Sequence, residues 1–481
     1  MDHRKNLTGH LVAYAISACI LLAGCGFQTY SPKPINPSLS AVGYRSHDPN
    51  GEQFSNYLIA QGYPAEKLPI KQWGVNELTL CALFFHPELD LARAQWQSAK
   101  AEQITATQRP DLGISGQLEN HSRTDGGISP WTYGLSIDIP VETTNKGQAR
   151  ADRASSLSEA ARINIAQTAW QIRNRLVNSL NEYQASLQQF ELLQQELDRH
   201  NEIVAILEAR LSAGLVSNIE VSNARLERQK SQQLLEAEKS RQAELRAMLA
   251  SNVGLSLDAF DQLALAKPLS VSNYPRYSRD ETQEVALLNR LDIRAELAKY
   301  AAIEAKLRLE IARQYPDIVL SPGYAYDQSD HIWSLGISSL ITLLNKNAGL
   351  IAEARSLREV EVAQFNALQA KVIGDMEQAR VRYFATLDEL DKAQELQQAQ
   401  NTHLKEIEKQ FDAGFADRLE LTTAKLENLL AAKIALNAEL KVRHAISSLE
   451  DTLQRPLDDS FIMPGNIEQA IRDKEEYQEH P

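Results

Sequence analysis

Proline is absent from two long parts of this 481-residue chain, and that absence constrains the fold more than any other feature. Prolines are frequent from Pro32 to Pro140, are missing until Pro268, and are missing again between Pro322 and Pro456. Both proline-free stretches are rich in Ala, Leu, Gln, Glu, Lys and Arg, which favour helices, and their apolar spacing is typical of coiled coils. The sequence therefore predicts very long helices.

The two stretches are similar to each other at a separation of about 200 positions, which indicates an internal duplication. Ala213 and Gly214 align with Ala413 and Gly414, and each glycine interrupts an otherwise continuous helical pattern. We therefore expect one helical hairpin in each half, with its turn at the glycine. The expected helices are 76–109, 147–212 and 217–251 in the first half, and 282–314, 346–411 and 418–453 in the second. At 1.5 Å per residue, the longest would measure roughly 100 Å. The half-length helices of each half are expected to stack end to end beside the long one.

Between these helices lie four short segments with alternating hydrophobicity, 112–119 and 133–141 in the first half and 318–326 and 333–338 in the second. Each has one apolar face and one small or polar face. That pattern fits the wall of a transmembrane β-barrel, and it fits the half-buried sheet of a soluble protein equally well. Four strands do not close a barrel, and an open edge in lipid leaves backbone groups unsatisfied. If the strands span a membrane, several copies must share one barrel.

The first residues have the pattern of a secretory signal. Arg4 and Lys5 precede an apolar run that ends in Leu22, Ala23, Gly24 and Cys25. Small residues before a cysteine resemble the bacterial lipobox, so we expect Cys25 to become the lipidated first residue of the mature chain. A plain signal peptide with an incidental cysteine is the alternative.

Composition excludes several functional classes. The formal net charge of -13 argues against a nucleic-acid-binding surface, and three cysteines do not form a disulfide framework. A mean hydropathy of -0.36 leaves no room for a bundle of apolar membrane helices. The ten histidines are dispersed without metal-ligand spacing, and no phosphate-binding glycine loop occurs. We therefore expect no cofactor and no metal site, whereas the composition alone still allows an ordinary soluble enzyme.

The duplicated unit of half-length helix, strand pair, long helix and half-length helix, behind a lipobox, resembles the TolC-like outer-membrane factors, and most closely their lipoprotein branch. Within 78–94, His86-Pro87-Glu88-Leu89 looks like the family's entry segment. The segment from Ala213 to Arg225 is similar to the hairpin-tip motif of the family. The resemblance covers about residues 76–458.

This resemblance implies a mainly α fold with a small β part. In the family, duplicated long helical hairpins form a periplasmic α-barrel, and four strands per chain contribute to a shared trimeric outer-membrane β-barrel. It also implies a homotrimer that works with a periplasmic adaptor and an inner-membrane pump of the RND or ABC type. The pump would supply the energy, so the resemblance implies that this chain is not an enzyme. The expected parts of the chain are a signal at 1–24, a lipid-anchored extended arm at 25–75, a first repeat at 76–267, a linker at 268–281, a second repeat at 282–458 and a flexible tail at 459–481.

The resemblance also assigns roles to residues at the two hairpin tips. Residues expected to dock the adaptor are Ala213, Gly214, Leu215, Val216, Ala413, Gly414, Phe415 and Ala416. Glu220 and Glu420 match acidic positions near the tunnel entrance, where three copies of each would form carboxylate rings that favour cations. A solvated charge on a helix surface is the alternative for each of them.

One departure concerns how the closed tips are held. Family members have Tyr and Arg near the second tip glycine, where this chain has Phe411 and Ala416. Arg418 or Asp412 could supply the lock instead, or the closed state could rest on apolar contacts of Phe411 and Phe415.

The expected function is therefore the exit duct of a tripartite efflux system that passes small molecules. The outer-membrane component of a type I protein secretion system is the alternative, because the pump and the adaptor select the cargo. A lipid-anchored coiled-coil tether would not need the paired strands, and an adaptor protein usually has a single helical hairpin.

Overall fold

The computed structural model describes residues 28–122, 129–266, 290–327, 330–340 and 346–457. The chain divides into two units, Met1–Ser46 and His47–Pro481. The signal segment 1–24, Cys25, the linker 268–281 and the tail 459–481 lie outside the described residues. In the described ranges, no helix is both long and apolar enough to cross a membrane.

The segment expected as an extended arm contains helices. Its described part holds α2 (Pro37–Arg45) in the first unit, and α3 (Glu52–Ala60) and the 3-10 turn η1 (Ala65–Lys67) in the second. Phe54, Tyr57 and Leu58 of α3 are fully buried, at the i, i+3, i+4 spacing that places side chains on one helix face. The expectation of an extended arm over 25–75 is therefore wrong for this part, because these apolar residues fold onto the body of the second unit.

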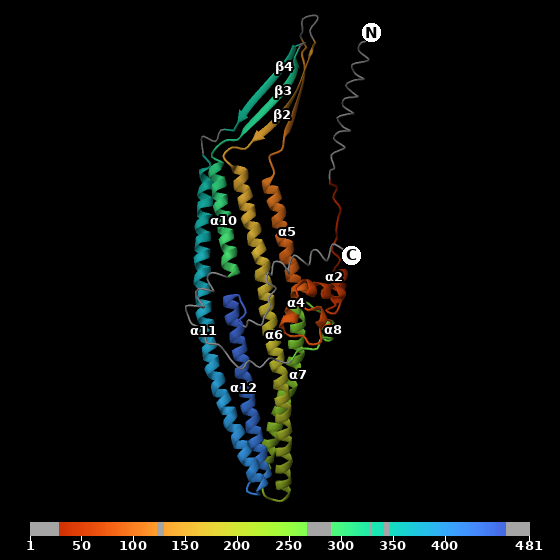
Figure 1. Ribbon diagram of the computed structural model, residues 1–481, viewed down its shortest axis with the longest axis vertical. Helices are drawn as coiled ribbons and strands as arrows, with labels where there is room; N and C mark the ends of the chain where they lie inside the picture. The colour runs from red at the N-terminus through yellow and green to blue at the C-terminus, as the bar shows by residue number, and fades with distance from the viewer. Residues whose placement is uncertain (1–27, 123–128, 267–289, 328–329, 341–345, 458–481) are drawn as a thin grey trace. The chain divides into compact units, whose positions relative to one another are not determined.

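Two long helical hairpins dominate the second unit (Figure 1). The first joins α6 (Lys146–Ser212) to α7 (Asn218–Val253), and the second joins α11 (Ala348–Asp412) to α12 (Arg418–Leu453). With 67 residues, α6 is about 100 Å long. Ser217 and Asp417 cap the returning helices by accepting hydrogen bonds from backbone N–H groups of the first turn. The prediction of duplicated long hairpins is confirmed.

The segment 76–109 is two helices, α4 (Val75–Phe85) and α5 (Pro87–Thr107), where the sequence predicted one. His86 has an extended backbone between them, because the residue before a proline is driven away from helical geometry and Pro87 has no N–H for the helical ladder. The short helix α8 (Leu257–Phe260) follows α7, and α10 (Leu291–Ala312) is the half-length helix of the second half.

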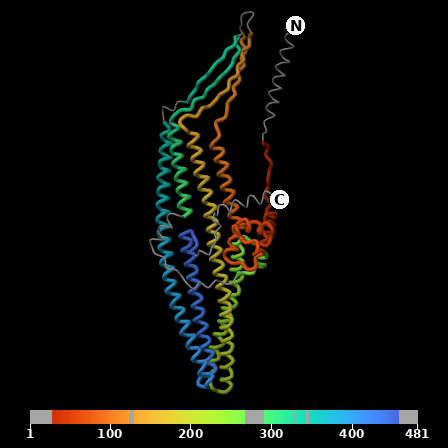
Figure 2. Tube along the Cα trace, viewed as in Figure 1, coloured from red at the N-terminus to blue at the C-terminus, as the bar shows by residue number. Residues whose placement is uncertain are grey.

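The half-length helices stack end to end along the long ones, as expected (Figure 2). In the first half, α7 ends at Gly254, which has a left-handed backbone with φ +82°. A Cβ atom there would lie 2.9 Å from the Cα of His86, so α7 ends against the α4–α5 break. In the second half, the Leu291 N–H donates to the side chain of Gln454 at 2.6 Å, which joins the start of α10 to the end of α12.

The four strands form one antiparallel sheet in the order β1-β2-β3-β4. They are β1 (Gly113–Asn120), β2 (Trp131–Val141), β3 (Ile318–Asp327) and β4 (Asp330–Ser339). Pairing within each predicted hairpin is confirmed, and β2 also pairs with β3, which joins the two halves of the chain. In the second unit, the sheet lies at the end opposite the hairpin turns (Figure 1).

Large buried side chains gather where α3, α4, α7 and α8 meet the middle of α6. This cluster includes Phe54, Tyr57, Trp73, Phe84, Leu176, Leu249 and Phe260. A second cluster lies between α11 and α12 and is built mainly from Leu and Ala, with Met376 and Tyr383. Small residues in such a seam let two helices approach closely along their length.

Candidate functional site: the sheet and the hairpin tips

One face of the sheet is continuously apolar. The strand register places on it Ile114 and Leu118 of β1, Tyr133, Leu135, Ile137 and Ile139 of β2, Leu320 and Tyr324 of β3, and Trp333, Leu335 and Ile337 of β4. The side chains of β1, β2 and β4 on this face are exposed, and Trp333 is 81% exposed. In a chain on its own, such a patch marks a surface that another molecule or a membrane covers.

Aromatic side chains concentrate at one end of this face, near the loops that join the strands. Tyr133 stacks on Tyr326 with ring centroids 5.0 Å apart, and Tyr324 packs against Trp333 at 4.9 Å. The Tyr324 hydroxyl is 2.6 Å from Nδ1 of His331. Aromatic residues at one level of an apolar strand face are typical of the belt where a transmembrane barrel meets the headgroups.

The opposite face of the sheet carries small and polar side chains. The register aligns Glu119, Thr132, Asp327 and Asp330 in one row across all four strands. Asp138 lies near the other end, where it accepts hydrogen bonds from Ser115 at 3.0 Å and Ser321 at 2.5 Å. The four strands contain no Lys or Arg. A polar, acidic face opposite an apolar one fits the lumen side of a channel wall.

Both outer strands of the sheet have a free edge within one chain. β1 pairs only with β2, and β4 pairs only with β3, among the described residues. Each edge presents a row of N–H and C=O groups, which water can satisfy but lipid cannot.

The two hairpin turns have the same conformation. Gly214 has φ +73° and Gly414 has φ +77°, and a Cβ atom at either position would meet nothing within 4 Å. Each turn is closed by a backbone hydrogen bond that follows the glycine, from Leu215 N–H to Arg210 and from Phe415 N–H to Gln410. The predicted docking residues Ala213 and Ala413 end the long helices as their C-caps. Val216 and Ala416 are partly buried, whereas Leu215 and Phe415 project from the turns, and Phe415 is 86% exposed.

Glu220 and Glu420 occupy equivalent positions, each in the first turn of a returning helix and each exposed. The Glu220 carboxylate accepts a hydrogen bond from the Ser217 hydroxyl at 3.0 Å and completes a capping box with the Ser217 backbone. Glu220 thus also stabilises the start of α7. The backbone N–H of Glu420 donates to the side chain of Asp417, and Glu420 is exposed to solvent.

Arg418 makes an ion pair between the two hairpins. Its guanidinium lies 2.5 Å from the carboxylate of Glu202 on α6. A second pair joins Arg210 on α6 to Asp417 at 2.9 Å. Asp412, the other candidate lock, is exposed at the end of α11.

These pairs change the pKa values of their carboxylates. Partial burial would raise the pKa of Glu202, but the hydrogen bond and charge of Arg418 outweigh it and hold the pKa below its ordinary value. The Glu420 backbone N–H and the Arg210 guanidinium lower the pKa of Asp417. Both carboxylates are therefore ionised at neutral pH.

Phe411 and Phe415 have different surroundings. Phe411 is partly buried and packs with Ala416 against a small cluster of Ile407, Leu421 and Ala424 inside its own hairpin. Its ring therefore stabilises the second hairpin itself, whereas the exposed Phe415 ring is available to another molecule.

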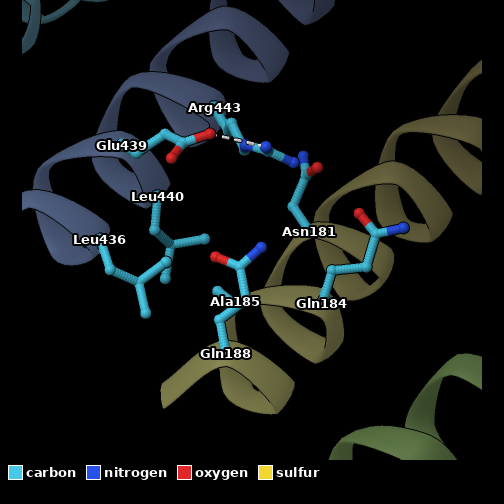
Figure 3. A pocket seen from close by; sticks show the side chains of 8 residues that line it. All are labelled: Asn181, Gln184, Ala185, Gln188, Leu436, Glu439, Leu440 and Arg443. Atoms are coloured by element: carbon cyan, nitrogen blue, oxygen red, sulfur yellow. Dashed lines mark hydrogen bonds and ion pairs between the residues drawn. The ribbon is translucent and has the colours of Figure 1, made fainter. Parts of the chain in front are cut away.

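Sequence reasoning missed the partners Glu202, Arg210 and Asp417. Each pairs with a residue about 200 positions away in the chain, and no local pattern signals such a contact. The seam between α6 and α12 is polar elsewhere as well. Figure 3 shows Asn181, Gln184 and Gln188 of α6 opposite α12, where Arg443 donates to Glu439 at 2.7 Å.

Among the residues that the structure describes, no group of three or more His, Cys, Asp or Glu side chains could hold a metal ion. Burial raises the pKa of the Cys81 thiol, the one free thiol in these ranges, far above its usual value. Cys81 packs as a small apolar side chain in the core.

Part of the chain is similar in sequence to known proteins. Residues 82–254 match the family described as outer membrane efflux protein. The cobalt-zinc-cadmium resistance protein CzcC of Cupriavidus metallidurans is 24% identical over 244 residues, which are 50% of this chain. The match spans 57% of the length of CzcC.

Solved structures share the fold over most of the chain. The outer membrane protein VceC of Vibrio cholerae is similar with a TM-score of 0.66 at 20% identity, over 80% of this chain and 97% of VceC. The CmeC outer membrane channel of Campylobacter jejuni has a TM-score of 0.67 at 14% identity, over 94% of this chain and 97% of CmeC. Residues 82–254 are thus similar to the outer membrane efflux protein family, and the chain shares the fold of these outer-membrane channels.

Proposed function

We propose that this protein is the outer-membrane exit duct of a tripartite efflux system. It would receive small molecules from an inner-membrane pump of the RND or ABC type and a periplasmic adaptor. The observation that carries this proposal is the sheet, which is apolar on one face, acidic on the other and unpaired at both edges. Helices of about 100 Å continue from the sheet and give the duct the length to cross the periplasm.

The free edges support a homotrimer. A barrel of three copies would pair β4 of each copy with β1 of the next and leave no edge in the lipid. The apolar face would then contact the membrane, and the row of Glu119, Asp327 and Asp330 would face the lumen.

The protein is proposed to reside in the outer membrane as a lipoprotein, anchored through Cys25, with a large periplasmic extension. The lipobox-like run before Cys25 supports the anchor. Gly26 follows the cysteine, where an Asp would favour retention in the inner membrane.

The hairpin tips are the proposed periplasmic gate and adaptor-docking surface. The exposed Leu215 and Phe415 offer apolar contacts to an adaptor, and Glu220 and Glu420 would form acidic rings at the entrance. Arg418 holds the two hairpins of a chain together through Glu202, which supports it as part of the closed state.

The proposed class of cargo is inferred from similar proteins. CzcC is described as a cobalt-zinc-cadmium resistance protein, which favours metal ions or other small solutes over proteins. The acidic lumen face would attract cations. Type I protein secretion remains the alternative assignment.

Single-channel conductance in planar bilayers tests the proposal. The purified full-length protein should form pores that prefer cations. The double variant Glu220→Gln, Glu420→Gln should reduce this preference, because both charges are removed while a glutamine at position 220 can still accept the capping hydrogen bonds. Glu102→Gln on the exposed surface of α5 is the matched control and should conduct like the wild type. A protein that inserts and never conducts would exclude the channel and favour the tether.

A further inference from the structure

A buried lysine joins the two halves of the chain where the helices meet the sheet. Lys146, the first residue of α6, is buried, and its Nζ atom lies 2.6 Å from the carbonyl oxygen of Tyr315 and 2.8 Å from the carboxylate of Asp317. Both acceptors belong to the link between α10 and β3, in the other half of the chain. A buried ammonium group is stable only when such partners replace its hydration. The contact therefore binds the start of α6 to the second half.

The duplication supplies a second lysine at the corresponding place. Lys146 and Lys346 stand at the same distance in sequence before the turn glycines, Gly214 and Gly414. Because α11 begins two residues after Lys346, this lysine precedes its helix and has a left-handed backbone. The long, flexible stem of a lysine can absorb such an offset. Lys346 is exposed in the single chain, whereas Lys146 is buried.

The link that accepts the lysine is duplicated as well. Asp111 follows a proline between α5 and β1, as Asp317 follows one between α10 and β3. All residues from 108 to 112 are exposed, whereas Asp317 is partly buried. Arg109 is the counterpart of Tyr315, whose carbonyl oxygen binds Lys146 while its side chain is 57% exposed. The link between α5 and β1 therefore has the same acceptors and lacks the cover.

Lys346 and Asp111 lie at opposite edges of one chain. One side of α6 packs against α5 and another against α10, and α11 packs on α10 (Figure 1). Neither residue makes an ion pair with another described residue. In a closed ring, the edge formed by α11 and β4 meets the edge formed by α5 and β1 of the next copy. That arrangement brings the exposed lysine to the exposed carboxylate.

We propose that Lys346 of each copy binds the α5–β1 link of the next copy, with its ammonium group between the Asp111 carboxylate and the backbone carbonyl of Arg109. This inference rests on the proposed trimeric duct and deepens it, because it assigns the residues of one contact between copies. Three such contacts alternate around the ring with the three contacts of Lys146 within the chains. Together they close a ring of polar contacts where the helices meet the sheet.

Cross-linking of the purified full-length protein in detergent tests the proximity. Lys346→Cys with Asp111→Cys should give covalent dimers and trimers on a denaturing gel after treatment with a short bifunctional thiol reagent. The control is Arg308→Cys with Asp152→Cys, because these residues lie 3.3 Å apart within one chain, across the contact of α10 with α6. It should stay monomeric and gain the mass of one linker. The wild type, treated in the same way, gives the background from the native cysteines.

The outcomes separate this inference from the proposed function. A wild type that is not a trimer would overturn the proposed function and this inference with it. A trimer in which the Lys346→Cys, Asp111→Cys variant yields only monomers, while the control is linked within its chain, would overturn this inference alone.

Charge exchange provides an independent test of the pairing. Lys346→Asp places two carboxylates at each contact, and its trimers should dissociate about tenfold faster or more in a denaturing detergent, because three contacts hold one trimer. Lys346→Asp combined with Asp111→Lys restores opposite charges at an unchanged net charge, and the wild-type rate should return. Arg109→Gln, on the same link, is the control and should dissociate like the wild type, since only the backbone of Arg109 is used. A charge-exchanged variant that dissociates as fast as Lys346→Asp would contradict the proposal.

Discussion

Helix ends meet in two places that differ in packing. One is the junction of α4, α5 and α7, and the other is the pair of hairpin tips. At the junction, Gly254 lies in backbone contact with His86 beside a cluster of large buried side chains. At the tips, Gly214 and Gly414 turn in open space, and the contacts between hairpins are exposed ion pairs. Buried packing tolerates almost no displacement, whereas exposed pairs can break and re-form. From this difference we expect a rigid junction and easier displacement at the tips.

Among these changes, Gly254→Val should lower the stability of the protein most. It adds a branched side chain at φ +82°, where its Cβ would lie 2.9 Å from the Cα of His86, and both backbones are fixed. We expect a loss of about 3 to 5 kcal/mol in the free energy of unfolding, measured by denaturant titration. Gly374→Ala within α11 is the control, since nothing lies within 4 Å and the change favours the helix by roughly 0.5 to 1 kcal/mol. Equal stability of the two variants would contradict the claim that Gly254 is packed closely against the backbone of His86.

Glu450→Ala should cause the next largest loss of stability. Glu450 lies 3.0 Å from Arg173, and both side chains are almost fully buried between α6 and α12. Removing the carboxylate that faces a buried guanidinium should cost about 3 kcal/mol in the free energy of unfolding. Glu450→Gln keeps a hydrogen-bond acceptor and should lose less stability than Glu450→Ala. A smaller loss in Glu450→Ala would contradict the claim that an unpaired buried guanidinium causes the destabilisation.

Arg418→Ala makes the matched change at the tips and should cost less than about 1 kcal/mol, because solvent screens its pair with Glu202. The thermal midpoint should hardly move. The proposed gate predicts an effect on leak through the pore, measured as spontaneous openings in bilayers. An unchanged leak would show that Arg418 does not stabilise the closed state, even if it contributes to the stability of the fold.

The smallest effect concerns pH. The pKa values of Glu202 and Asp417 are lower in the folded protein than their ordinary values. Their pairs therefore contribute fully at neutral pH, and the contribution is lost only as the pH falls below the ordinary carboxyl pKa values and through the lowered folded ones. Spontaneous openings should become more frequent in that range in the wild type. The Arg210→Ala, Arg418→Ala variant should show a weaker dependence, and an identical dependence in both proteins would assign the pH effect to other groups.

Much of the architecture could be predicted from the sequence, because its signals are local. The absence of proline and the capping residues define the long helices, and α12 begins and ends at the expected residues, Arg418 and Leu453. The alternating pattern placed three strands to within about two residues, and β4 begins three residues before the predicted 333–338. The turns at Gly214 and Gly414 followed from the repeated motif.

The remaining features depend on tertiary contacts. In the segment 25–75, α3 forms because Phe54, Tyr57 and Leu58 find a core supplied by distant helices. The pairing of β2 with β3 and the ion pairs of Arg210 and Arg418 join the two halves of the chain. A single exposed charge in a helical pattern does not reveal whether a partner will face it, so these contacts emerged only from the structure.

The mass of the detergent-solubilised, full-length particle tests the central claim most directly. A sheet with two free edges and one apolar face requires neighbours, and the account predicts a particle of three copies with no monomer at equilibrium. A stable, folded monomer that keeps its strand structure in detergent would contradict the shared barrel, and with it the proposed duct.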